Sequence, residues 1–155
     1  MSVVNLFEAE VEKDEEDAPG YELSYTRVGP LVGGEQLGLT VYELAPGQSI
    51  CPYHYEYPEE EWLFVLTGRV DVRTPEGEEE LGPLEVVCFP TGPSGAHKVT
   101  NRSDETARVV MLSTKAQVAV AVYPDSGKML ASTGNPEDRL MARKDSAVDY
   151  YDGEA

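Results

Sequence analysis

The sequence predicts an all-β fold, a single small barrel or sandwich of mostly antiparallel strands. Eight short segments rich in Val, Leu, Tyr and Thr fall within roughly one hundred residues. Turn-forming pairs such as Gly33-Gly34, Pro46-Gly47 and Gly82-Pro83 separate them at close intervals. Helix-length amphipathic stretches are missing, and the nearest candidate, residues 135–144, has a proline near its start and supplies two or three turns at most.

The expected strands follow one another from residue 21 to residue 123. In chain order they are Tyr21–Val28, Leu37–Leu44, Trp62–Thr67, Arg69–Arg73, Leu84–Phe89, Ala96–Thr100, Arg108–Ser113 and Val118–Tyr123. One hairpin is expected to turn at Gly68, between WLFVLT and RVDVR. A second is expected at Pro75-Glu76-Gly77, between VDVRT and EEEL.

The length favours one domain with an arm at each end. At 155 residues and 17.0 kDa the chain can bury a single core. We expect an acidic N-terminal arm over residues 1–20, the barrel over residues 21–124, and a tail over residues 125–155. The acidic run within residues 8–17 is interpreted as a solvated arm. The tail is rich in glycine and charge, so we expect it to wrap the barrel or a partner subunit.

The charge balance argues against nucleic acid and membrane surfaces as partners. There are 29 acidic and 12 basic residues, for a formal net charge of −17, so phosphate backbones and anionic lipids are repelled. No apolar run is long enough to span a membrane, and the first residues lack the basic end and apolar stretch of a signal peptide. We therefore expect a cytoplasmic protein.

The two cysteines, Cys51 and Cys88, belong to no CxxC pair. In a reducing compartment both are expected to be free, buried thiols. Because Cys51 lies three residues before His54, a thiolate nucleophile at Cys51 is an alternative, although no activating geometry is visible in the sequence.

The chain has only two histidines, and both lie at the edges of the strand-rich region, beside turns. Residues two apart on a strand share a face, so His54 and Glu56 are expected to project to the same side. After the turn at Pro58, the chain re-enters a strand at Glu61, whose carboxylate can return to that side. His97 begins a later strand, as expected when a neighbouring strand closes a barrel around a metal. The pattern predicts a metal site formed by His54, Glu56, Glu61 and His97.

Each of these residues also has a simpler interpretation. A lone histidine is more often a hydrogen-bonded structural residue, and Glu59-Glu60-Glu61 reads equally as a solvated charge run. The combination is harder to explain in that way, because the histidines and Glu56 sit among aromatic and aliphatic residues. Buried carboxylates need a cation, and few basic residues lie nearby, so a metal is the simpler means of neutralising them.

Residues 46–101 resemble the two signature motifs of the cupin superfamily. The first motif is matched by Gly47, by His54 and Glu56 at its H-x-H positions, by Glu61 and by Gly68. The second is matched by Pro90-x-Gly92, His97 and Asn101. Further stretches, including PYHYE, EEWL and VYPDSGK, look like small single-domain bacterial cupins, most of them without an assigned reaction. The resemblance implies a jelly-roll barrel, also called a double-stranded β-helix.

Four departures from the motifs affect what the resemblance implies. Six residues rather than five separate Gly47 from His54, and four rather than two separate Gly92 from His97. Leu84-Glu85 stands where many cupins have Gly-Asp. Glu56 replaces the second histidine of H-x-H, so the implied ligand set becomes two imidazoles and two carboxylates, from His54, Glu56, Glu61 and His97.

Such a ligand set suits one divalent transition metal, namely Mn, Fe, Zn or Ni. If Glu56 stays off the metal, it can serve as a general base beside a hydroxy-ketone, as in sugar isomerases or epimerases. Two histidines and one carboxylate with open positions would instead suit an Fe-dependent dioxygenase. Scattered arginines and no phosphate-binding loop favour a neutral polyol or small organic acid as substrate.

A non-catalytic small-ligand-binding or structural module is the alternative function, because fold does not determine activity. The resemblance also implies a homodimer, since small cupins often pair through exchanged edge strands. The segments 21–28 and VDYYDGE are the expected crossing pieces.

Overall fold

The computed structural model of the chain describes residues 1–13 and 17–154. The described residues form thirteen strands with only single turns of helix between them, which confirms the all-β prediction. The strands are β1 Glu12–Lys13, β2 Ser24–Arg27, β3 Leu37–Leu44, β4 Tyr55–Tyr57, β5 Glu61–Thr67, β6 Val70–Thr74, β7 Gly77–Leu81, β8 Val86–Phe89, β9 Lys98–Thr100, β10 Ala107–Thr114, β11 Ala119–Tyr123, β12 Lys128–Ser132 and β13 Leu140–Arg143. The helical turns are α1 Val28–Leu31, η1 Pro93–Gly95, η2 Pro124–Ser126, η3 Pro136–Asp138 and η4 Lys144–Ser146.

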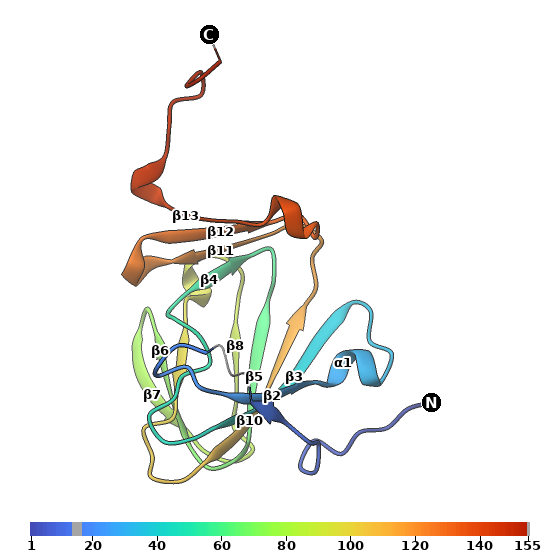
Figure 1. Ribbon diagram of the computed structural model, residues 1–155. Helices are drawn as coiled ribbons and strands as arrows, with labels where there is room; N and C mark the ends of the chain where they lie inside the picture. The colour runs from blue at the N-terminus through green and yellow to red at the C-terminus, as the bar shows by residue number, and fades with distance from the viewer. Residues whose placement is uncertain (14–16, 155) are drawn as a thin grey trace.

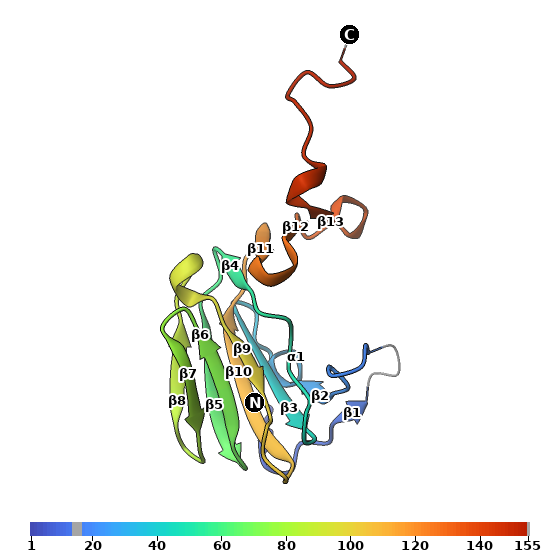
Figure 2. The ribbon, with the colours of Figure 1, turned by 90° about the vertical axis from the view of Figure 1, so that its left-hand side faces the viewer.

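Two sheets enclose the main core (Figures 1 and 2). One has six strands in the order β1-β2-β3-β10-β5-β8, and the other has three in the order β7-β6-β9. Alternate residues of each strand point inward, as Leu63 and Val65 do on β5 and Val70 and Val72 do on β6. The complete buried cluster is Leu23, Leu44, Leu63, Val65, Val70, Val72, Phe89, Val99, Ala107, Val109 and Met111. This apolar packing is the main source of stability of the barrel.

One of the two expected hairpins is confirmed and the other is wrong. Strands β6 and β7 pair across a two-residue turn, with Thr74 opposite Gly77. Strands β5 and β6 do not pair with each other, because they belong to different sheets. Gly68 between them has φ +75°, and a Cβ there would lie 2.7 Å from Ala107 Cα. The chain therefore turns a tight corner against the start of β10 and moves to the opposite sheet, as only glycine permits.

A third sheet, in the order β13-β12-β11-β4, lies at the mouth of the barrel (Figure 1). The expected strand over 118–123 is confirmed as β11, but β4 on one side of it and the hairpin β12–β13 on the other were not expected. Residues 135–144 contain one 3-10 turn and β13, not a helix of two turns. The tail thus extends a sheet rather than wrapping the barrel, and its last residues project away from it (Figure 2). Whether the tail contacts a partner stays a prediction.

Part of the N-terminal arm is packed rather than solvated. Val4, Leu6 and Val11 lie on the outer face of the six-stranded sheet, against a buried cluster that contains Val41. The guanidinium of Arg108 donates hydrogen bonds to the carbonyl oxygens of Leu6 and Ala9. Within the run 8–17, which we expected to be solvated, Val11 is packed, whereas Glu8, Glu10 and Glu12 are exposed as expected. Residues 14–16 of the acidic run lie outside the described residues.

Within the described part of the chain, we find no helix whose length and hydrophobicity suit a bilayer crossing.

Candidate metal centre

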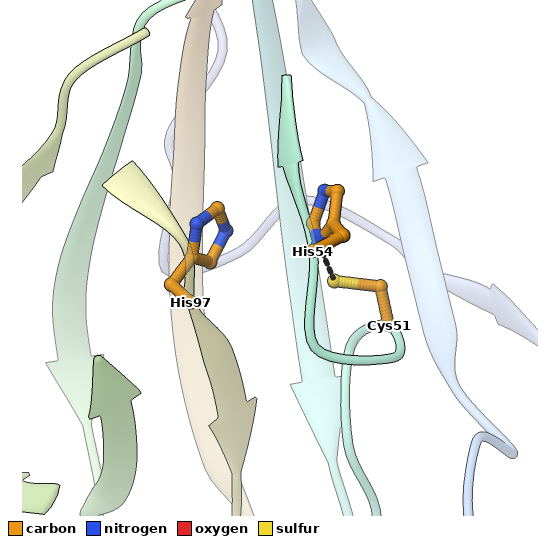
Figure 3. Close-up of side chains that lie close together, drawn as sticks. All are labelled: Cys51, His54 and His97. Carbon is orange, nitrogen blue, oxygen red and sulfur yellow. Dashed lines mark hydrogen bonds between the residues drawn. The ribbon is translucent and has the colours of Figure 1, made fainter. Parts of the chain in front are cut away.

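The barrel mouth brings the two histidines directly opposite each other. His54 precedes β4 and His97 precedes β9, and the two residues exchange backbone hydrogen bonds, with N···O distances of 3.1 and 2.8 Å. Their ring centroids are 4.8 Å apart, and the two side chains come from neighbouring segments (Figure 3). The loop after Phe89 and the loop before β4 are therefore joined by an isolated β-bridge between His97 and His54, which holds the two side chains at the same level in the barrel mouth.

The backbone determines which nitrogen each histidine offers. Nδ1 of His54 lies 3.0 Å from the carbonyl oxygen of Pro52, and Nδ1 of His97 lies 2.9 Å from that of Gly95. A carbonyl oxygen only accepts hydrogen bonds, so we assign the proton of each neutral ring to Nδ1 and the lone pair to Nε2. Metal-ligating histidines are commonly oriented in this way. Nε2 of His97 is buried and has no hydrogen-bond partner among the described residues.

Two carboxylates complete the cluster. Glu61 Oε2 lies 3.5 Å from His97 Nε2 and 3.9 Å from His54 Nε2. Glu56 Oε1 lies 3.7 Å from His54 Nε2. Donor atoms around one ion at about 2.1 Å are about 3 to 3.5 Å apart, so a small contraction brings these atoms to coordination distance. All four residues that the sequence singled out are thus brought together: Glu56 from the middle of β4, Glu61 from the start of β5, and His54 and His97 from the residues just before β4 and β9.

The charges of this cluster are poorly accommodated without a cation. Burial raises the pKa of Glu61 to about 7, with the charge of Glu59 adding to the effect. Burial, the hydrogen bond to Glu59 and the charge of Glu61 raise the pKa of Glu56 to about 8. Burial and the proximity of His54 lower the pKa of His97 to about 4, and burial also lowers the pKa of His54. Without a metal the site therefore favours neutral imidazoles and protonated carboxyls, which a divalent ion would displace.

Two aromatic rings that the sequence did not single out form the walls of the cluster. Phe89 stacks on His97, with centroids 3.7 Å apart and an interplanar angle of 7°. Tyr123 of β11 stacks on His54 at 5.7 Å and 18°. The strand alternation that places Val87 inward also places Phe89 inward, so the sequence pattern could have predicted the position of Phe89. Tyr123 had none, since only the chain topology brings β11 beside β4.

Cys51 lies behind His54. Its Sγ is 3.4 Å from His54 Nδ1 (Figure 3), whereas the other ring nitrogen, Nε2, is the one near the carboxylates of Glu56 and Glu61. Cys51, His54 and His97 together offer ligand atoms within 4.8 Å of one another, so the structure contains a possible His/Cys metal site. Both cysteines are free, and each is only partly buried. Burial and the charges of Glu61 and Glu56 raise the pKa of Cys51, which disfavours the thiolate nucleophile considered from the sequence.

One ion pair holds the third sheet to the barrel beside this site. Arg73 of β6 donates two hydrogen bonds to Asp125, at 2.6 and 3.0 Å, and Asp125 lies two residues after Tyr123. The guanidinium also lies over the ring of Tyr53, 3.9 Å from its centroid, and Tyr53 adjoins His54. Arg73 therefore joins the loop that carries His54 to the turn that follows Tyr123.

Asn101, the last residue of the second motif, has a structural role. It is fully buried, and its amide donates to the carbonyl oxygens of Leu44 and Glu105. Its own oxygen accepts hydrogen bonds from Ser103. The motif asparagine thus fixes the loop after β9 rather than entering the metal cluster.

Comparisons with known proteins agree with this architecture. The cupin domain family matches residues 40–113. A candidate sugar phosphate isomerase from Acidithiobacillus ferrooxidans is 22% identical over 93% of this chain and 91% of its own, with a TM-score of 0.81. A sugar phosphate isomerase of a cupin superfamily from Silicibacter pomeroyi is 24% identical over 97% of this chain and 98% of its own, with a TM-score of 0.80.

A polyketide cyclase from Streptomyces resistomycificus is 25% identical, covering 74% of this chain and 79% of its own, with a TM-score of 0.59. No curated protein matches this sequence. At these identities the two isomerase structures establish the fold, not the reaction.

Proposed function

Because this chain is a cupin, with its cupin domain over residues 40–113, we propose that it is a metal-dependent isomerase of a small hydroxy-carbonyl compound of the sugar class. The observation that carries this choice is the position of Glu56, whose carboxyl group lies within 3.7 Å of His54 Nε2, beside the residues that would hold the metal. A carboxylate at that position can accept a proton from a bound substrate and return it. In the metal-free protein the pKa of Glu56 is raised to about 8. The names of two structural neighbours as sugar phosphate isomerases support the same class.

We assign the metal to His54, Glu61 and His97, with Glu56 as a fourth ligand that can leave. The unpartnered, buried Nε2 of His97 supports this assignment, since a metal would satisfy that atom. Two imidazoles and two carboxylates suit Mn²⁺, Fe²⁺, Zn²⁺ or Ni²⁺ and give a formally neutral site. When bound, the ion supplies Lewis acidity to the carbonyl oxygen of the substrate.

Isomerisation of an aldose to a ketose consists of proton transfers, which the protein has to catalyse. Conversion of an aldose to a ketose removes a proton from the carbon next to the carbonyl and returns one to the neighbouring carbon. A second proton passes between the two oxygens, so no oxidant or reductant is needed. Glu56 has the more exposed side chain of the two carboxylates, 22% against 18% for Glu61, and lies on the strand beside Tyr123. It is therefore the carboxyl we assign as the proton carrier.

Incubation with a panel of aldoses, ketoses and their phosphates in D₂O tests this function. Isomerisation should leave the mass of the carbon skeleton unchanged and place deuterium at one carbon, as NMR detects. Glu56→Gln should abolish exchange and retain metal if Glu56 is the proton carrier. Glu60→Gln is the matched control, because that carboxyl accepts a hydrogen bond from Trp62 outside the cluster and should retain activity. Full activity of Glu56→Gln would contradict the assigned role.

The metal itself has a separate test. Protein purified without added metal should contain close to one transition-metal ion per chain by elemental analysis. His97→Ala should lower that content by tenfold or more, because it removes a buried ligand. A folded wild-type protein that neither contains nor binds metal would contradict the site.

An Fe-dependent dioxygenase is the second candidate, favoured by the spacing of His54, Glu61 and His97 as two histidines and one carboxylate. Oxygen uptake and a product heavier by two oxygen atoms would select it over isomerisation. Metal binding with neither outcome across the panel would favour a non-catalytic module that binds a small ligand.

A further inference from the structure

The outer face of the three-stranded sheet carries charged side chains at the floor of a hollow. On β6, Val72 points into the core, so its neighbours Asp71 and Arg73 point outward. The register places Lys98 of β9 directly beside Arg73 on that face. The hollow has a volume of about 390 Å³, within the range of about 300 to 1,000 Å³ that is typical of small-molecule sites. On the side of the sheet it is lined by Asp71, Arg73, Glu78, Lys98, Thr100 and Arg102.

Two loops complete the walls of this hollow. One is the segment 19–21, which precedes β2, and the other is the loop that follows β3. The two are joined by a hydrogen bond of 2.8 Å that the amide of Ser49 donates to the carbonyl oxygen of Gly20. Ser49 is buried, and its hydroxyl shares a hydrogen bond of 2.9 Å with the hydroxyl of Thr100. The hollow is therefore built by several separate segments of the chain and not by one surface loop.

Three cationic side chains, those of Arg73, Lys98 and Arg102, line this hollow in an otherwise acidic protein. Like charges directly opposite each other on paired strands are destabilising, and Arg73 and Lys98 are such a pair. Arg73 is compensated by its ion pair with Asp125. Lys98 makes no ion pair with the described residues, and its ammonium group lies 5.3 Å from the centre of the Tyr21 ring. An anion in the hollow would compensate Lys98 and reduce the repulsion.

The two arginines keep hydrogen-bond donors for a ligand. Arg73 and Arg102 each donate two hydrogen bonds to a carboxylate, whereas a guanidinium group has five N–H donors. Their side chains are 41% and 54% exposed, so these ion pairs are screened by water and are weak. The carboxylates of Asp71 and Glu78 line the same hollow and can accept hydrogen bonds from hydroxyl groups. The lining thus suits a small molecule with an acid group at one end and hydroxyl groups elsewhere.

We propose that this hollow binds a small hydroxylated acid, with its carboxylate or phosphate group at Lys98 and its hydroxyl groups at Asp71 and Glu78. The net charge of −17 argues against extended polyanions. Charges more than about 10 Å away are screened at 0.1 M salt, so a small anion responds mainly to the cations around it. The site is separate from the metal centre. The side chain of His97 joins the cluster in the barrel mouth, whereas that of the next residue, Lys98, lines the hollow outside.

Titration calorimetry at constant ionic strength tests this site with inorganic phosphate and with gluconate, and sorbitol is the uncharged counterpart of gluconate. At least one of the two anions should bind once per chain, with a dissociation constant of about 1 mM or lower, and the one that binds identifies the acid group. Sorbitol should bind at least about tenfold more weakly, because it lacks the charge-assisted hydrogen bonds. Chelator-treated protein should bind the anion equally well. Binding of neither anion, equal binding of sorbitol, or loss of binding after chelation would overturn the proposal.

Lys98→Gln and its matched control Lys115→Gln change the net charge of the chain equally. Lys98→Gln should weaken anion binding about tenfold or more, because it removes the ammonium group that faces the acid. Lys115 is exposed and lies outside the hollow, so Lys115→Gln should leave the dissociation constant within about twofold. Circular dichroism establishes that each variant is folded. Arg102→Gln changes a more exposed side chain and should also weaken binding, which decides the matter if Lys98→Gln does not fold. Equal weakening by Lys98→Gln and Lys115→Gln would refute a site at Lys98.

Discussion

Removal of the metal is expected to make the protein progressively less stable as the pH rises from 6.5 to 8. In the metal-free protein the pKa values of Glu61 and Glu56 are raised to about 7 and about 8, from an ordinary 4.5. A carboxyl whose pKa is raised by folding contributes stability below its unfolded pKa, and that contribution is lost as the pH rises through the folded value. The lowered pKa values of His54 and His97 act in the opposite sense, but only below about 6.5, where their unfolded forms become charged.

The window from pH 6.5 to 8 therefore isolates the two carboxyls. Each bound proton is worth about 1.4 kcal/mol per pH unit, so the free energy of unfolding should fall by about 2 kcal/mol across the window, with Glu56 contributing most. With metal bound, both carboxyls are already deprotonated in the folded state and this loss should disappear. The bound metal should also add about 2.7 kcal/mol when its free concentration is a hundred times the dissociation constant.

Urea unfolding at pH 6.5 and 8, with a chelator or with excess metal, measures these differences. The double variant Glu56→Gln/Glu61→Gln is the control, because it keeps the shape of the site and removes both titrating groups. Its stability should be nearly independent of pH across the window. A metal-free wild-type protein whose stability is constant or rises from pH 6.5 to 8 would refute the reasoning, and so would an equal fall in the double variant.

Three further predictions concern the backbone and the substrate. Gly68→Ala should lower the free energy of unfolding by about 2 to 4 kcal/mol in urea titrations, since its Cβ would meet backbone at 2.7 Å; a loss below 1 kcal/mol would contradict that corner. Leu84 has φ +69° and is 84% exposed, so Leu84→Gly should relieve backbone strain without loss of packing. The free energy of unfolding should rise by about 0.5 to 1 kcal/mol and the melting temperature should rise with it; an unchanged or lower melting temperature would contradict the strain. The sequence favours a substrate without phosphate, so Lys128→Met, which removes the ammonium 5.4 Å from the ring of Tyr123, should change kcat/KM by the same factor for a phosphorylated substrate and its unphosphorylated counterpart, and a loss confined to the phosphorylated one would contradict that expectation.

The local sequence pattern was sufficient to predict the positions of most strands but not which strands pair with each other. The expected bounds of β3 are those observed; β10 is one residue longer at each end than expected, and β11 begins one residue later. The hairpin at Gly68 was wrong because two consecutive strands joined by a glycine can either pair or cross between sheets, and here they cross. Strand β4 has only three residues and precedes Pro58, so it carried too little periodicity to be recognised.

The candidate site was predictable where it depended on spacing. His54, Glu56, Glu61 and His97 converge because period-two alternation and the barrel closure place their side chains on one side. The residues that surround them depend on tertiary contacts between distant segments, which a single sequence does not reveal. Tyr123 reaches His54 only through the pairing of β11 with β4, and Arg73 reaches Tyr53 and Asp125 across two sheets.

Leu84 links the departures from the family motif to a measurable consequence. The sequence places Leu84 where many cupins have glycine, and the structure gives it the positive φ that glycine adopts readily. Leu84 thus holds a positive φ without being glycine. Its amide donates a hydrogen bond to the carbonyl oxygen of Val65 at 2.8 Å, which stabilises this backbone conformation. The strain is local and is compensated by the pairing of this turn with β5.

The replacement of a motif histidine by Glu56 has two consequences that follow from where the residue lies. A second carboxylate neutralises a divalent ion completely, whereas a third imidazole would leave a net positive charge. Glu56 also belongs to a different sheet from Glu61: β4 pairs only with β11, whereas β5 belongs to the six-stranded sheet. Its approach to the other three residues depends on the backbone bridge between His54 and His97 and on the hydrogen bond that the amide of Gly92 donates to the carbonyl oxygen of Glu56. In the proposed function this position suits Glu56 to the role of proton carrier, because a shift of its strand would disturb the main barrel less than a shift of Glu61, which lies on a strand of the six-stranded sheet.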